Sequence, residues 1–142
     1  MSTLVEQAVE KWKRDGASPR APAVLGDFDA LEQFLGRSLP NDIRALYLCA
    51  DGMSDSSSDR HLVSFWSLSR IIHEREVTTG SDERGQYTDV AFADVLISSW
   101  YFWLRIRSNG HWSVFVEVTK EELSTFGEFL SLYVADPDRL CL

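Results

Sequence analysis

The chain has 142 residues and a formal net charge of −8, from 22 acidic and 14 basic residues. This length fits a single domain, which buries roughly two thirds of its unfolded surface. The acidic balance argues against nucleic-acid binding, which needs a basic surface. It suits a basic protein partner, and a role in solubility alone is the alternative. No run of the sequence approaches the ~18 apolar residues of a membrane span.

The first 50 residues show the spacing of three amphipathic helices. Thr3 and Glu6 form the pattern of a capping box ahead of the first helix. Asp27 is a suitable cap for the second helix, which Gly36 ends, and Pro40 suits the first position of the third. The predicted helices cover residues 3–14, 28–35 and 40–50.

The middle of the chain is polar and acidic. Residues 51–99 hold nine acids and four bases. Asp51, Asp55 and Asp59 recur at every fourth position, whereas a calcium loop needs acids at every second position and a closing glutamate, so a solvated loop is expected. The predicted elements are a strand over residues 62–68, a short helix over 69–76, a loop over 77–88 and a strand over 89–98.

The segment from residue 100 to 118 predicts a β-hairpin. A two-residue turn would place Arg107 opposite Trp112 and put the two apolar faces on opposite sides of the sheet. A three-residue turn, with Gly110 in the left-handed conformation, places Ile106 opposite Trp112 and puts both apolar faces on one side. The expected pairs are Ile106/Trp112, Leu104/Val114, Phe102/Val116 and Trp100/Val118.

The opposite face of this hairpin is unusually aromatic for a solvated surface. It carries Tyr101, Trp103 and Phe115, so either something covers it or it binds something. Arg105 and Arg107 beside these rings could stack on nucleic-acid bases. In so acidic a chain we expect instead that their aliphatic stems cover aromatic surface.

The last part of the chain predicts one more helix. Thr119 and Glu122 have the spacing of a second capping box, and Asp136-Pro137 ends the helix. The order of helices, then mostly strands, then a helix predicts an α+β fold, with a central, mostly antiparallel sheet flanked by the N-terminal helices and the C-terminal helix.

Catalytic and metal-binding motifs do not emerge from the sequence. His61, His73 and His111 are isolated, and no zinc or phosphate-loop motif is present. Cys49 is expected to be a structural thiol, and two cysteines without a disulfide pattern suit a reducing cytoplasm. Asp94 lies inside an apolar strand and is expected to bond backbone amides at the strand end; a catalytic carboxylate is the alternative.

Several stretches, in this order, are similar to a known family. They are Leu31-Glu32-Gln33-Phe34-Leu35-Gly36, Leu39-Pro40-Asn41-Asp42-Ile43, Asp51-Gly52, Phe65-Trp66-Ser67-Leu68, Phe92-Ala93-Asp94 and Ser124-Thr125-Phe126-Gly127-Glu128-Phe129-Leu130. The chain resembles the SUKH superfamily, in particular its Smi/Knr-type branch, over residues 27–134, with the helix of residues 3–14 packed on it as part of one domain, 1–142. Asp51-Gly52 replaces the usual Asn-Gly, and Thr125 replaces a serine.

The resemblance implies a protein-binding module without enzyme activity or cofactor. Bacterial members commonly bind and neutralise a co-encoded toxin, often a nuclease or deaminase, whereas fungal members regulate cell-wall synthesis. We therefore expect a cytoplasmic immunity protein, a monomer or weak dimer, that occludes a basic toxin domain. A housekeeping regulator and a hydrolase using Asp94 with a histidine are the alternatives. The expected partner-binding residues are Asp55, Asp59, Asp82, Glu83, Tyr101, Trp103 and Phe115.

Overall fold

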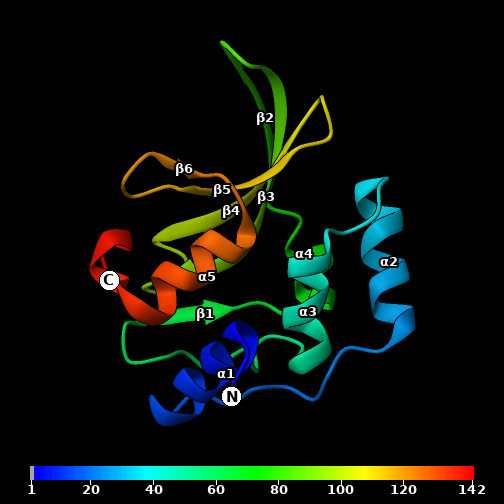
Figure 1. The fold of residues 1–142 in the computed structure, drawn as a ribbon. Coiled ribbons are helices and arrows are strands. Elements are labelled where there is room, and N and C mark those ends of the chain that lie inside the picture. The colour runs from blue at the N-terminus through cyan, green and yellow to red at the C-terminus, as the bar shows by residue number, and fades with distance from the viewer. Residues whose placement is uncertain (1) are drawn as a thin grey trace.

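The computed structural model describes residues 2–142 and has the predicted α+β architecture, with helices packed against an antiparallel sheet (Figure 1). The helices are α1 (Leu4–Arg14), α2 (Leu25–Leu35), α3 (Asn41–Cys49), α4 (Leu68–Glu74), α5 (Phe126–Ala135) and the 3₁₀ helix η1 (Pro137–Leu140). The strands are β1 (Val63–Phe65), β2 (Val77–Asp82), β3 (Gly85–Val95), β4 (Trp100–Arg107), β5 (Trp112–Val116) and β6 (Glu121–Leu123).

Strand β3 organises the sheet. The strand order is β1-β3-β4-β5-β6, and β2 also pairs with β3, so β1 and β2 share one edge of this long strand. Helix α4 lies between β1 and β2 in the chain. A β-bulge between Ala91 and Ala93 shifts the register of β3 against β4 where β1 gives way to β2. The extra residue, Phe92, packs in the core.

The β4–β5 hairpin has the predicted register. Ile106 lies opposite Trp112, Phe102 lies opposite Val116, and Gly110 has φ of 91°. The three-residue turn thus brings both apolar faces to the same side, as burial requires. The expected pairing of Trp100 with Val118 does not form, because β5 ends at Val116.

Two segments form a different type of secondary structure from the one predicted. Residues 77–88 form a β-hairpin instead of a loop, because Gly85, at φ of 110°, permits a tight turn and the flanking residues pair from Val77/Val90 to Asp82/Gly85. Residues 119–122 do not cap a helix. They turn back into β6, which pairs with β5, and the hydroxyl of Thr125 caps α5 by accepting the Glu128 N–H.

Other predicted boundaries are shifted. Helix α2 starts at Leu25, so Asp27 sits in its first turn and accepts the Val24 N–H at 3.0 Å instead of capping the helix itself. Helices α3 and α4 begin one residue after and one residue before the predicted starts. The predicted strand over 89–98 begins earlier and ends at Val95, and Ile97 is 94% exposed in the following turn.

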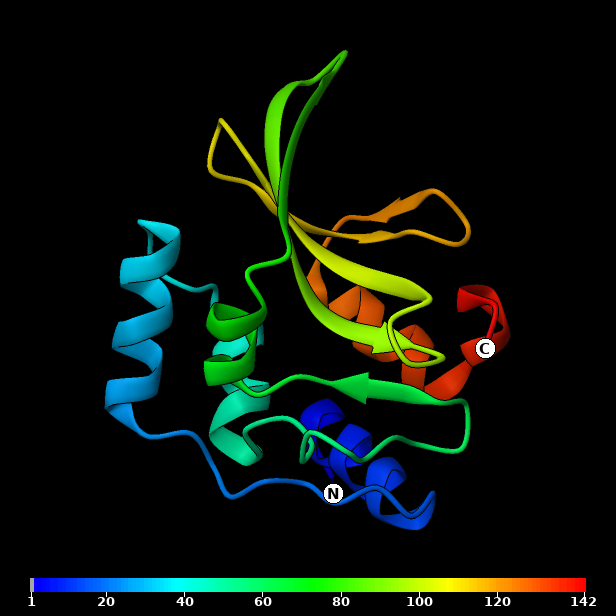
Figure 2. The ribbon, with the colours of Figure 1, turned by 180° about the vertical axis from the view of Figure 1, so that it is seen from behind.

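The core lies between one sheet face and the helices. The predicted capping box of Thr3 and Glu6 begins α1, which packs on α5 and α3. Phe65 of β1 is the centre of an aromatic cluster, with its ring 4.9 Å from Trp12 and 5.0 Å from Tyr133 between centroids. Figure 2 shows the sheet from the side opposite α5, and no helix within residues 2–142 crosses this second face, called the outer face below.

Candidate functional site

The outer face is built from side chains that alternate along β4 and meet partners on both neighbouring strands. Because of the bulge, Asp94 and Asp89 of β3 both lie on this face, although five residues separate them. Cross-strand partners define successive rows of side chains. The rows are Ser64–Asp94–Tyr101, Ala91–Trp103–Phe115–Glu122, Asp89–Arg105–Ser113 and Tyr87–Arg107.

One end of the outer face is closed by a buried ion pair. Arg105 donates two hydrogen bonds to Asp89, both 2.9 Å long, and each residue is over 90% buried. The guanidinium lies between two rings, 3.8 Å from the centroid of Tyr87 and 4.2 Å from that of Phe115. The expectation that Arg105 covers aromatic surface with its stem is thus too limited, since the charged group itself is stacked and paired.

Arg107 extends this closed end toward the β2–β3 hairpin. It donates to Asp82 at 2.8 and 2.9 Å and to Glu122 at 2.6 and 3.1 Å. The hydrogen bonds from Arg107 lower the pKa of Asp82 to about 2. Burial by itself raises the pKa of Glu122, but the hydrogen bonds from Arg107 and Ser113 outweigh it and bring the pKa to about 2.

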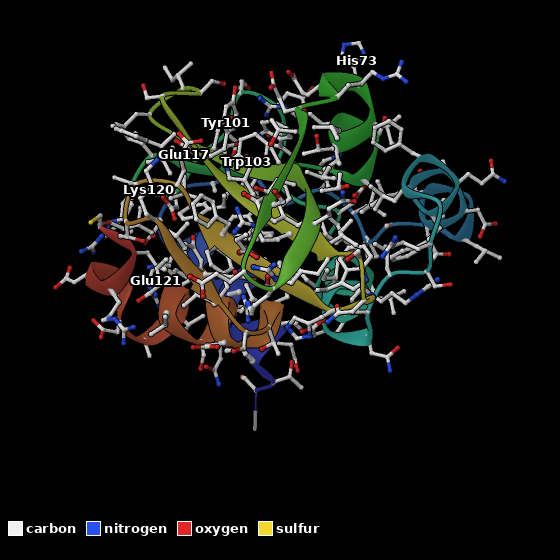
Figure 3. All side chains as sticks on the ribbon, turned by 90° about the horizontal axis from the view of Figure 1, so that it is seen from above. His73, Tyr101, Trp103, Glu117, Lys120 and Glu121 are labelled. Atoms are coloured by element: carbon white, nitrogen blue, oxygen red, sulfur yellow. The ribbon has the colours of Figure 1, made fainter. Side chains whose placement is uncertain are left out.

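Aromatic residues form the middle of the outer face. The rings of Trp66, Tyr101 and Trp103 follow one another edge to face, with centroids 5.9 and 5.3 Å apart. The indole N–H of Trp103 donates to Glu117 at 3.0 Å, and Figure 3 shows Tyr101, Trp103 and Glu117 side by side. Trp103 is 8% exposed although no described helix covers it, because its own neighbours on the sheet enclose it.

The other end of the outer face is open. Asp94 is buried and accepts the Trp66 indole N–H at 2.8 Å and an Arg70 N–H at 3.4 Å, both on the oxygen Oδ2. The expectation that it bonds backbone amides is wrong, because its partners are side chains. Beside it is a hollow of about 400 Å³, called the Asp94 hollow below. Its floor and walls include Asp55, Ser64, Arg70 and Asp94, and its rim includes Leu62, Leu96 and Ile97.

The predicted partner-binding residues do not all reach the surface. Asp55, Asp82 and Glu83 are exposed, although Asp82 is also held by Arg107. Tyr101 and Phe115 are half-buried, and Trp103 is buried. Asp59 is 2% exposed and accepts the N–H groups of His61 and Val63 and the hydroxyl of Tyr133. Asp59 is therefore a buried structural carboxylate, and the expectation that it belongs to a solvated loop is wrong.

Asp51 is also internal. It is 7% exposed and accepts the Leu68 N–H at the start of α4, at 2.9 Å. Burial raises the pKa of its carboxyl group. Gly52 beside it has φ of 68° and lies so close to the backbone of Trp66 that a Cβ would approach within 2.6 Å. This acidic Asp-Gly turn thus fixes the segment that carries Trp66.

Three contributors to the outer face were not predicted from the sequence, namely Ser64, Trp66 and Arg70. They come from β1, the connection that follows it and α4, and the pairing of β1 with β3 brings them to Asp94. Within residues 2–142, no three His, Cys, Asp or Glu side chains are grouped so that they could hold a metal ion. Of the helices described, none has the length and apolar character needed to cross a membrane.

The fold and this face define a class of small α+β protein whose sheet is covered by helices on one side and open on the other. Residues 22–132 match the model of the SMI1 / KNR4 family (SUKH-1). The chain belongs to that family, as its motifs predicted. No curated protein matches the chain significantly.

Proposed function

We propose that this chain is a non-enzymatic binding protein and, specifically, an immunity protein that neutralises a toxin domain by covering its active site. Membership of the SMI1 / KNR4 family is consistent with an immunity or interaction module. A basic nuclease or deaminase is the partner that the net charge of −8 suits best, and the cytoplasm is where we expect the two to meet.

The observation that carries the proposal is the outer face. Large aromatic residues, which are the usual anchors of protein interfaces, line a sheet surface that no helix within residues 2–142 covers. Tyr101 and Phe115 are half-buried there, so part of each ring is open to a partner. The neighbouring β2–β3 hairpin and the 54–58 loop bring acidic groups to the edges of the same surface.

The candidate partner-binding residues fall into two roles. Tyr101, Trp103 and Phe115 form the aromatic centre, where removal of a side chain changes the dissociation rate most. Asp55 and Glu83 are the exposed acids that act on encounter with a basic partner. Asp82 is proposed as part of the same acidic edge, although Arg107 already holds its carboxylate.

The deciding experiment is co-expression with the toxin domain encoded next to this chain. We expect restored viability and co-purification of the two proteins at 1:1 stoichiometry, with toxin activity blocked in the purified complex. A variant with Trp103 and Tyr101 both changed to alanine, checked for folding, should lose protection. A toxin that kills equally with and without this chain would contradict the immunity role and favour the housekeeping regulator.

No observation favours the hydrolase alternative. The hydrogen bonds that Asp94 accepts within residues 2–142 come from Trp66 and Arg70, not from a histidine. A general acid or base is expected to have its partner within hydrogen-bonding reach. We therefore carry forward only the binding function.

A further inference from the structure

The Asp94 hollow differs from the rest of the outer face because its polar groups are incompletely paired. Both hydrogen bonds to Asp94 end on Oδ2, and within the described residues none reaches Oδ1. Ser64 is the cross-strand neighbour of Asp94 and is 7% exposed, yet its hydroxyl oxygen has no hydrogen-bond partner within residues 2–142. Of these two atoms, only the Ser64 hydroxyl oxygen is enclosed without a partner, and enclosed polar groups are normally paired. Asp94 Oδ1 is open and is free to accept a hydrogen bond from a donor outside the chain.

Arg70 does not supply that donor. Its guanidinium lies over the Trp66 ring, 4.8 Å from the centroid, and its polar contacts with Asp94, Glu74 and the Asp55 carbonyl are all 3.4 or 3.5 Å long. Arg105 at the closed end holds Asp89 at 2.9 Å twice. Arg70 therefore neutralises the hollow only in part, and Asp55 and Asp94 outnumber it by two charges to one.

The rim of the hollow is apolar and exposed. Leu62, Leu96 and Ile97 are 49, 47 and 94% exposed, and a hydrogen bond of 3.1 Å from the Leu96 N–H to the Leu62 carbonyl holds their two loops together. All three residues have φ between 54° and 65°, in the left-handed region that residues other than glycine rarely adopt. Such strain around exposed aliphatic side chains is typical of recognition sites.

From these observations we propose that the Asp94 hollow receives an arginine side chain of the protein partner, and that an aliphatic neighbour of that arginine packs on the Leu62–Leu96–Ile97 rim. The planar guanidinium carries several N–H donors in a fixed fork, one of which would donate to the open oxygen Oδ1 of Asp94. The neighbouring Ser64 Oγ, which is enclosed in this structure, would become a second acceptor by rotation of its side chain toward the hollow. Its charge complements the acidic excess of the lining. The inference rests on the proposed function, since it names the chemistry that a basic partner would present.

The indole N–H of Trp66 reports on this site directly, because it donates to Asp94. We would record ¹⁵N–¹H spectra of the full chain during titration with acetyl-Leu-Arg-Leu-amide, and assign the Trp66 indole signal by its loss in Trp66→Phe. We expect a saturable shift of that signal. The matched peptide with citrulline in place of arginine keeps the shape without the charge. It should bind at least about tenfold more weakly, since hydrogen bonds between charged groups are stronger than those to neutral donors.

Two variants test the two halves of the site in a folded protein. Ser64→Ala removes an oxygen that has no partner, so it should fold normally and weaken the response to the arginine peptide. Ile97→Ser removes a side chain that is 94% exposed and should weaken it as well. Leu48→Ser, which changes an apolar residue 59% exposed on α3, is the matched control and should leave the titration unchanged.

The outcomes separate this inference from the proposed function. An unmoved Trp66 signal, or equal responses to the arginine and citrulline peptides, would overturn the arginine site. Full toxin neutralisation by Ser64→Ala and Ile97→Ser would also overturn it while leaving the immunity role intact. A saturable, arginine-selective shift in a chain that protects against no toxin would support the site and contradict the immunity role.

Discussion

Two carboxylates on one strand, Asp89 and Asp94, show how differently the two ends of the outer face are built. Both are buried and both face an arginine. Asp89 is held by two short hydrogen bonds from Arg105, whereas Asp94 meets Arg70 at 3.4 Å and lies beside a hollow. An aspartate–arginine pair thus stabilises the sheet at one end of the outer face, whereas at the other end it leaves one carboxylate oxygen without a donor.

The difference teaches that burial alone does not identify a binding group. A buried ion pair with full hydrogen bonding is a structural unit whose parts depend on each other. A buried carboxylate with one oxygen free is available to a ligand that brings its own donors. The comparison gives four expected outcomes, from the largest effect to the smallest.

The largest expected effect is on stability at the closed end. Arg105→Leu leaves Asp89 buried without its partner and should lower the free energy of unfolding by about 3–5 kcal/mol. Arg70→Leu, the matched change at the open end, should lower it by only about 1–2 kcal/mol, because the contact to Asp94 is longer and the hollow admits water. Urea unfolding of the two variants measures both. Equal losses would contradict the distinction between the ends.

Trp103 lies between the two ends of the outer face. Its substitution distinguishes a structural role of this residue from a role in binding the partner. Trp103→Ala should lower the free energy of unfolding by about 3 kcal/mol, because the ring is almost fully enclosed. If the ring is also an interface anchor, the dissociation rate of the toxin complex should rise by an amount equivalent to ~2 kcal/mol or more. A large loss of stability with an unchanged dissociation rate would rule out this part of the face as the binding surface.

Acid should weaken the closed end selectively. The pKa values of Asp82 and Glu122 are lowered to about 2 from ordinary values of 3.8 and 4.5. The folded chain therefore binds fewer protons than the unfolded chain in this window, and the stabilisation by Arg107 is lost as the pH falls from about 4.5 to about 2.

Arg107→Met is the variant that isolates the contribution of the Arg107 ion pairs to stability. At pH 6 it should be less stable than the unmodified chain, and the difference between the two should shrink through the same pH window. Urea unfolding at several pH values measures it. A difference that stays constant down to pH 2.5 would show that Arg107 acts through packing alone.

The smallest expected effect is on association. Changing the exposed acids Asp55 and Glu83 to lysine should slow capture of a basic toxin by up to roughly tenfold at low salt and flatten its salt dependence. Dissociation should change little for Glu83, which lies outside the Asp94 hollow, and more for Asp55, which lines it. Thermal stability should change little in either case, because both residues are exposed. Asp59 and Asp82 are left unchanged, since each is engaged inside the fold or by Arg107. An association rate that is independent of both charges would contradict electrostatic attraction of the toxin by these residues.

Patterns within one or two neighbouring elements were readable from the sequence. The β4–β5 register followed from matching two apolar faces, and the capping box of α1 followed from Thr3 and Glu6. The segment at residues 119–122 carried the same capping pattern but formed β6, because pairing with β5 buries Leu123. Strand pairing between distant residues therefore decided the structure of this segment over its local capping pattern.

The open end of the outer face could not have been read in the same way. Asp94 shares a face with Asp89 only because of the bulge at Phe92, and a plain alternation would place them on opposite sides. Ser64, Trp66 and Arg70 approach Asp94 through pairing of β1 with β3, across about thirty residues of chain. No spacing rule connects residues that meet by long-range pairing, so the aromatic face was predictable and its neighbouring hollow was not.

The central position of Phe65 has a consequence for synthesis on the ribosome. Its ring touches Trp12 near the start of the chain and Phe129 and Tyr133 near residue 130. The aromatic cluster therefore cannot close until α5 has left the exit tunnel, even though α1 emerges first. Strands β1 to β6 all precede α5 in the chain, so they are available for pairing before the aromatic cluster can close.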